Sequence, residues 1–233
     1  MRERHVGLLL LFAALLGGRA VAQVFPNDQA PHPAFPAAFT LFVFGAFQGD
    51  RVTRIYNVGL PPDPLDAACD STAGDCRTVH GLAGAAGIGV RGQFPLTPRS
   101  GIRVGVSASH PGRRVATRDG VLVAVPGEAV TLLRLDGLAL FRLKPQVPVY
   151  FGFGGSIGFY SAGPVRNQDA VTEVGAAFAV GVDHYISPTV GTRVEFTGFV
   201  MKPTAKTLSA EYHAHALAFD GQLSFGFNFL VKK

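Results

Sequence analysis

The chain has 233 residues, of which 48% are apolar and 16% are charged, and its formal net charge is +5. This length suits one barrel or one to two soluble domains. The 29 glycines and the absence of a 3.6-residue apolar period argue against a helical protein. The weak and dispersed positive charge gives no reason to expect a nucleic-acid partner.

Residues 1–22 have the features of a signal peptide. A basic start precedes an apolar run from Val6 to Leu16, and Ala20-Val21-Ala22 forms a small-residue cleavage site. The apolar run is too short to span a bilayer as a helix. We therefore predict an exported protein that begins at Gln23. Cleavage removes three of the 21 basic and one of the 16 acidic residues, which leaves a net charge of +3.

Residues 23–37 are rich in proline and are expected to form an extended N-terminal leader. The first strand is predicted from about Ala38 to Gln48. It is apolar on both faces, and we place four of its large side chains outward: Phe39, Leu41, Val43 and Phe47.

The longest connection follows, over about residues 49–80, and it contains both cysteines of the chain, Cys69 and Cys76. Two cysteines seven positions apart in an exported protein favour a local disulfide that staples this loop. A metal site would need more ligands nearby.

Six further segments alternate apolar residues with small or charged ones, which is typical of strands with a different environment on each face. They cover residues 82–94, 102–109, 130–143, 149–160, 173–186 and 190–201. Polar connections separate them, and the longest of these is residues 110–128.

The clearest alternation lies in the last segment, residues 213–229. From Leu217 the odd positions are mostly Leu and Phe, while the even positions are small or polar. Its apolar stripe is as long as the ~9–11 residues with which a tilted strand crosses a bilayer. A strand with unpaired backbone groups is not stable in lipid, so this segment is expected to belong to a closed barrel.

Together the segments predict an all-β fold, an eight-stranded antiparallel up-and-down transmembrane β-barrel over residues 38–233. The connections alternate long and short, as in barrels with long extracellular loops and short periplasmic turns. A soluble lipocalin-like barrel is the structural alternative. It would hide its apolar residues inside, whereas here the charged residues share faces with glycine, which favours lipid outside.

The pattern resembles the small bacterial outer-membrane β-barrel proteins of the eight-stranded OmpA/OmpX-like kind. Leu223, Phe225, Phe227 and Phe229 resemble the terminal signal that the barrel-assembly machinery recognises in that family. The resemblance implies location in the bacterial outer membrane, with outer-membrane lipid and lipopolysaccharide as neighbours. We expect a monomer.

The inward faces are expected to form a filled polar lumen, because eight strands enclose a space just wide enough for side chains. The predicted network is Arg91, Arg103, Arg134, Asp136, Arg142, Asp183, Arg193, Glu195 and Asp220. Counting back from the turns places Asp183 opposite Arg193 and Arg91 opposite Arg103. The two arginines would then need a carboxylate from elsewhere, such as Asp136 or Asp220.

Two glycine motifs give only weak support for a catalytic or cofactor-binding site. Residues 154–158 fit the G-x-S-x-G elbow, but no helix follows Ser156. Residues 87–92 fit the G-x-G-x-x-G loop, but they too lack the helix that would hold phosphates. We therefore predict no catalytic residue and no cofactor.

A polar group near the last strand offers a further hypothesis. Glu211, His213 and His215 alternate on one face and could hold a metal, or serve a lipid hydrolase together with Ser209. We favour ordinary interfacial polar residues and predict no metal. In the connection 110–128 the arginines could bind lipopolysaccharide phosphates, although solvated loop charge is the favoured interpretation; they are Arg113, Arg114 and Arg118.

The leading functional hypothesis is a non-enzymatic outer-membrane barrel whose long loops contact the cell exterior. Two alternatives stay open. A lipid-modifying enzyme would need a Ser/His/acid set at the rim, and a narrow passive channel for small or apolar solutes would need a gap in the lumen.

Overall fold

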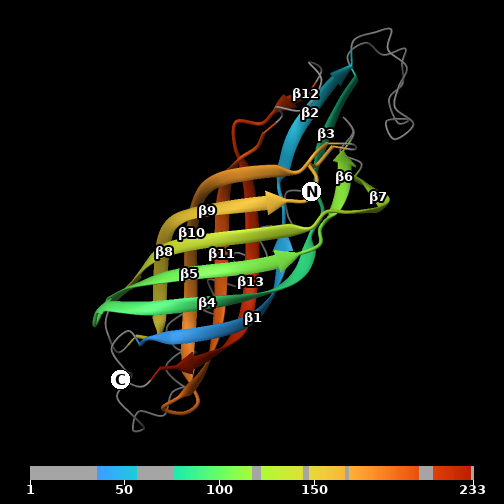
Figure 1. Ribbon diagram of the computed structural model, residues 1–233. Helices are drawn as coiled ribbons and strands as arrows, with labels where there is room; N and C mark the ends of the chain where they lie inside the picture. Colours follow the sequence, from blue (N-terminus) through green and yellow to red (C-terminus); the bar gives the residue numbers. More distant parts are fainter. Residues whose placement is uncertain are drawn as a thin grey trace, which may run out of the picture. The chain divides into compact units, whose positions relative to one another are not determined.

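Eight antiparallel strands close into a barrel in the computed structural model, which describes residues 36–56, 76–116, 122–143, 147–165, 168–204 and 212–231. Each barrel strand pairs with the next one in the chain, and the last closes on the first (Figure 1). This confirms the predicted up-and-down barrel. Its strands are β1 (Ala38–Phe47), β4 (Ala85–Thr97), β5 (Ser100–Ser109), β8 (Leu132–Arg142), β9 (Val149–Tyr160), β10 (Val171–Tyr185), β11 (Val190–Lys202) and β13 (Ala218–Leu230).

The outer wall of the barrel is apolar and the inner wall is largely polar. On β13, Phe225 and Phe227 are 46% and 47% exposed, while Ser224 and Asn228, which flank this pair along the strand, are 2% and 1% exposed. The same alternation on the other strands exposes Phe, Leu, Ile and Val around the wall. Such a large apolar surface is unfavourable in water and suits hydrocarbon. The exposed phenylalanines argue against the lipocalin-like alternative.

The two ends of the barrel differ in their connections. Short turns join β4 to β5, β8 to β9 and β10 to β11, whereas long segments join the strands at the other end. Ala38 pairs with Leu230, so the first and last barrel residues both lie at the short-turn end. In the described part of the chain, no helix is long and apolar enough to cross a membrane. The predicted signal peptide (1–22), nearly all of the leader and Cys69 lie outside the described residues, as does the side chain of Cys76.

Three of the long connections, which the sequence analysis treated as loops, form a second sheet. We call it the outer sheet, and its strand order is β12-β2-β3-β6-β7. Its buried face includes Val52, His80 and Val115, which lie side by side on β2, β3 and β6. The strands are β2 (Asp50–Tyr56), β3 (Cys76–Leu82), β6 (Gly112–Ala116), β7 (Leu122–Ala129) and β12 (Tyr212–Ala214). Short runs of β-branched and aromatic residues favour these strands, such as V-T-R-I-Y in β2.

The pairing of β4 with β5 also differs from the prediction. Arg91 lies opposite Gly105, and the residue opposite Arg103 is Gln93. The strands continue past Phe94 through an irregularity between Pro95 and Thr97, so the turn is tighter than the sequence indicated. The pairing therefore moves by two residues. A shift of two preserves the face on which each side chain lies, so both arginines still point inward.

Candidate functional site in the barrel lumen

All nine predicted lumen residues are buried, and each takes part in at least one ion pair. The network extends over three levels of the barrel: a middle level around Glu195, a level near the short turns around Asp183, and a level near the long connections around Asp220. Two acidic or basic residues that the sequence analysis did not include, Arg51 and Glu173, complete the third level.

Glu195 is the centre of the middle level. Arg103 Nη1 pairs with its Oε2, and Arg91 Nη1 lies 3.1 Å from its Oε1. The hydroxyl of Tyr150 donates to Oε2 at 2.5 Å. Arg103 also reaches Asp136, with 2.7 Å between Nη2 and Oδ1. Although Arg91 and Arg103 are not opposite each other, they still share a carboxylate, and that carboxylate is Glu195. Two arginines and two carboxylates balance at this level.

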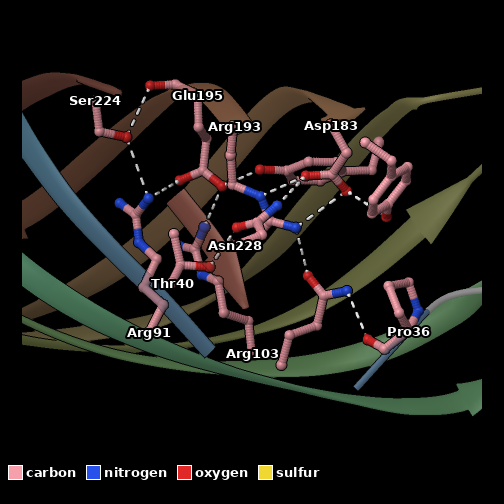
Figure 2. A network of polar contacts seen from close by, with 12 residues as sticks. Pro36, Thr40, Arg91, Arg103, Asp183, Arg193, Glu195, Ser224 and Asn228 are labelled. Atoms are coloured by element: carbon pink, nitrogen blue, oxygen red, sulfur yellow. Dashed lines mark hydrogen bonds and ion pairs between the residues drawn. The ribbon is translucent and has the colours of Figure 1, made fainter. Parts of the chain in front are cut away.

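Asp183 binds two arginines at the level near the short turns. The Asp183 Oδ1 atom accepts from Arg193 Nε at 2.7 Å, and Oδ2 accepts from Arg142 Nη2 at 2.8 Å. Asp183 and Arg193 are direct cross-strand partners, as counting from the turn predicts. Asn228 Nδ2 donates to the same Oδ1 at 3.0 Å, which ties the last strand to this cluster (Figure 2).

The residues just before β1 are joined to the same network. Gln93 Oε1 accepts from Arg193 Nη2 at 2.7 Å, while Gln93 Nε2 donates to the carbonyl oxygen of Pro36 at 3.1 Å (Figure 2). Thr40 donates to Asn228 Oδ1 at 2.7 Å. The series of hydrogen bonds therefore continues from the barrel wall to the start of the first strand.

Asp220 joins two arginines at the level near the long connections. Its Oδ2 lies 2.5 Å from Arg134 Nη2 and 2.8 Å from Arg51 Nη2. Arg51 belongs to β2 of the outer sheet and is fully buried. Burial alone would lower the pKa of Arg51, but the charges around it, Asp220 first, raise that pKa above the ordinary arginine value. This guanidinium therefore stays charged.

The lumen also contains an apolar cluster that the sequence analysis missed. It consists of Leu138, Leu140, Tyr150, Ala177, Ala179, Phe199 and Met201, on the inner faces of β8 to β11. Guanidinium groups stack on aromatic rings nearby: Arg134 lies 4.1 Å from the Phe199 ring centroid, and Arg193 lies 4.7 Å from that of Tyr150. Such contacts are favourable where the cation is desolvated. Charged and apolar side chains thus fill the interior together.

Gly181 allows the Tyr150 ring to lie against the inner wall. A Cβ atom at Gly181 would come within 2.3 Å of the Tyr150 hydroxyl oxygen. Replacing Gly181 by valine should therefore displace the ring from Glu195 and cost about 1–3 kcal/mol of stability, as overpacking does. Denaturant unfolding of the refolded protein measures this cost. Gly45→Ala is the matched control, because no atom lies within 4 Å of a Cβ there. Equal stability of the two variants would contradict the packing argument.

Two members of the polar group predicted near the last strand, His213 and His215, lie among the described residues. His213 is exposed on β12, and His215 Nε2 lies 2.8 Å from Thr53 Oγ1. Glu211 and Ser209 lie outside the described residues. No group of three His, Cys, Asp or Glu that could hold a metal is found among the described residues.

The other predicted motifs lie in strands or bind protein groups. Ser156 is buried in β9 and donates to the carbonyl oxygen of Leu135 at 3.1 Å. Residues 87–92 lie within β4. Arg113 donates to the carbonyl oxygen of Gly163 at 3.0 Å, and Arg114 pairs with Asp50 at 2.8 Å. Arg118 lies outside the described residues.

Comparison with known proteins finds similar solved structures. No protein-family model matches the sequence. No curated protein matches it either. Ail, the attachment invasion locus protein of Yersinia pestis, is 10% identical with a TM-score of 0.41, over 83% of this chain and 98% of Ail. The outer membrane protein AlkL is 12% identical with a TM-score of 0.48, over 90% of this chain and 96% of AlkL. Neisserial surface protein A is 12% identical with a TM-score of 0.40, over 83% of this chain and 99% of that protein. The barrel itself is established here by its strand pairing.

Proposed function

We propose that this protein is an integral barrel of the bacterial outer membrane, with a closed lumen, that carries the outer sheet at the cell surface as a contact surface. The apolar outer wall supports the membrane location, because closed barrels are the β-structures that lipid accepts. The export signal predicted at residues 1–22 agrees with this location. In such barrels the long connections lie outside the cell and the short turns in the periplasm.

The observation that carries the proposal is the filled lumen. Six arginines and five carboxylates are buried and paired inside the barrel or at its mouth, and apolar side chains occupy the inner face of β8 to β11. Ions that pass through such an interior would have to break several buried charge pairs, which is costly. The interior therefore favours an anchor over a conduit.

The outer sheet supports a role in surface contact. Short turns would be enough to join the barrel strands, yet this chain builds five further strands at one end of the barrel. Binding residues are found disproportionately on connections that a rigid scaffold positions. Outer-membrane lipid and lipopolysaccharide are the proposed neighbours of the apolar wall, and the phenylalanines of β13 are the proposed signal for the barrel-assembly machinery.

Planar-bilayer recordings test the closed lumen. The refolded protein, which should first show the heat-modifiable gel shift of a membrane barrel, is expected to give no steady high conductance. Gln93→Ala and Ser224→Ala serve as controls. They shorten inward side chains but keep every charge pair, so they too should give no steady high conductance. Steady openings of the unmodified protein would overturn the proposal in favour of a narrow channel. Hydrolysis of added phospholipid that depends on His213 or His215 would instead favour a lipid-modifying enzyme.

A further inference from the structure

A β-bulge directs Arg51 of the outer sheet toward the barrel. Asp50 pairs with Gly81 and Val52 pairs with His80, so Arg51 is the extra residue and has no partner on β3. On its other side, the Arg51 carbonyl oxygen accepts from the backbone nitrogen of His215 at 2.8 Å. A bulge breaks the regular alternation of a strand and re-aims the side chain at that position.

The Arg51 guanidinium is bound by groups from three barrel strands. Its Nε donates to Glu173 of β10, with 3.1 Å to Oε2 and 3.2 Å to Oε1. Its Nη2 donates to Asp220 of β13 at 2.8 Å and to the hydroxyl of Tyr160 of β9 at 2.9 Å. Its Nη1 donates to the carbonyl oxygen of Gly49 at 2.9 Å. Every nitrogen of the planar guanidinium thus has an acceptor, which is the geometry that distinguishes arginine from lysine sites.

The acceptors on the barrel side, Asp220 and Tyr160, are also held by contacts with residues other than Arg51. Asp220 is held by Arg134 below it and by the backbone nitrogen of Gly49, at 3.1 Å from Oδ1. Tyr160 packs in an apolar cluster with Leu82 and Leu132. If Arg51 left, Asp220 would keep Arg134 but Glu173 would lose this ion pair, and the buried site would hold an uncompensated negative charge, which is strongly unfavourable.

We propose that Glu173, Asp220 and Tyr160 form a guanidinium receptor in the barrel mouth, and that Arg51, its resident ligand, is a latch that holds the outer sheet to the barrel. When Arg51 withdraws, the sheet is released and the receptor accepts an external guanidinium. This goes beyond the proposed function, because it concerns how the sheet is held rather than what the sheet contacts.

The test uses the full chain with Arg51→Ala, refolded in lipid vesicles and followed by hydrogen exchange. The amides of β2 and β12 should exchange about tenfold or more faster than in the unmodified protein, since local opening needs less free energy, while those of β9 and β10 stay protected. Added methylguanidinium should bind saturably to this variant. Amide exchange at the mouth ends of β9 and β13 should then change with the methylguanidinium concentration. Unchanged exchange in β2 and β12 would overturn the latch.

Three controls separate the receptor from general effects. Arg114→Ala removes an arginine of the same sheet whose side chain is 22% exposed, and it should create no methylguanidinium site. Arg51→Ala with Glu173→Gln should bind at least about tenfold more weakly, because one carboxylate charge is lost. Equal binding by this double variant, by Arg114→Ala or by the unmodified protein would overturn the receptor.

A folding defect in Arg51→Ala leaves the proposal testable. The variant is then refolded with and without methylguanidinium, and the heat-modifiable gel band is measured. Recovery of the folded band with methylguanidinium, but not with an equal concentration of sodium, is the expected result. Equal yields of the folded band with methylguanidinium and with sodium would contradict the proposal.

Discussion

Glu195→Gln should destabilise the folded barrel by about 3–5 kcal/mol, the usual cost of removing one partner from a buried charge cluster. Arg91 and Arg103 both pair with this carboxylate, and both are buried. The glutamine is nearly the same size, so the loss reports charge and hydrogen bonding rather than a cavity. Denaturant unfolding in lipid vesicles, followed by the heat-modifiable gel shift, measures the change.

Asp50→Asn is the control for this prediction. Asp50 pairs with Arg114 at a similar distance, 2.8 Å, but its side chain is 43% exposed. An exposed ion pair contributes about 0–1 kcal/mol, so this variant should unfold almost as the unmodified protein does. If both variants lost the same small amount of unfolding free energy, the middle level of the lumen would have to be open to water.

Phe225→Arg should cost about 2–4 kcal/mol, the penalty for arginine on the lipid face at the bilayer midplane. Phe225 lies near the centre of β13, and its side chain is 46% exposed on the outer wall. In water the same substitution on an exposed site would cost little. Reversible unfolding from lipid vesicles therefore distinguishes hydrocarbon from solvent around the barrel.

Phe229→Arg gives the depth dependence of that penalty. Phe229 has the same face and a similar exposure, 43%, but it lies one residue from the end of β13. Near the membrane interface the cost of arginine falls to about 0–1 kcal/mol. Equal costs for the two phenylalanine variants would count against a bilayer around this wall.

Most barrel strands could be predicted from the sequence because large apolar residues alternate along them with small or polar ones. On β13 that alternation is unbroken from Phe219 to Phe229 except at Gly221. The same rule, continued along β8, places Leu138 and Leu140 inside together with Arg134, Asp136 and Arg142, so the apolar part of the lumen also follows from the sequence. The Asp183–Arg193 pair follows from a short turn, whose length fixes the register.

The outer sheet and its contact with the barrel could not be predicted in the same way. Its strands are short, and β12 has only three residues, so alternation is too brief to recognise. A bulge such as that at Arg51 depends on the register of two strands joined by a long connection. The length of such a connection does not fix the register, so the bulge cannot be located from the sequence. Likewise, the sequence could not show that Glu195 serves both Arg91 and Arg103, because Glu195 lies on β11, which pairs with neither β4 nor β5.

The pairing of β1 with β13 has a consequence for biogenesis. Thr40 and Asn228 form a hydrogen bond across 188 positions of sequence, and all ten residues of β1 pair with β13. Contacts so distant in sequence form late and slowly. Until the last strand arrives, β1 presents an unpaired edge that can add to other chains. Ring closure therefore waits for β13, and shielding of this edge of β1 until then would limit aggregation.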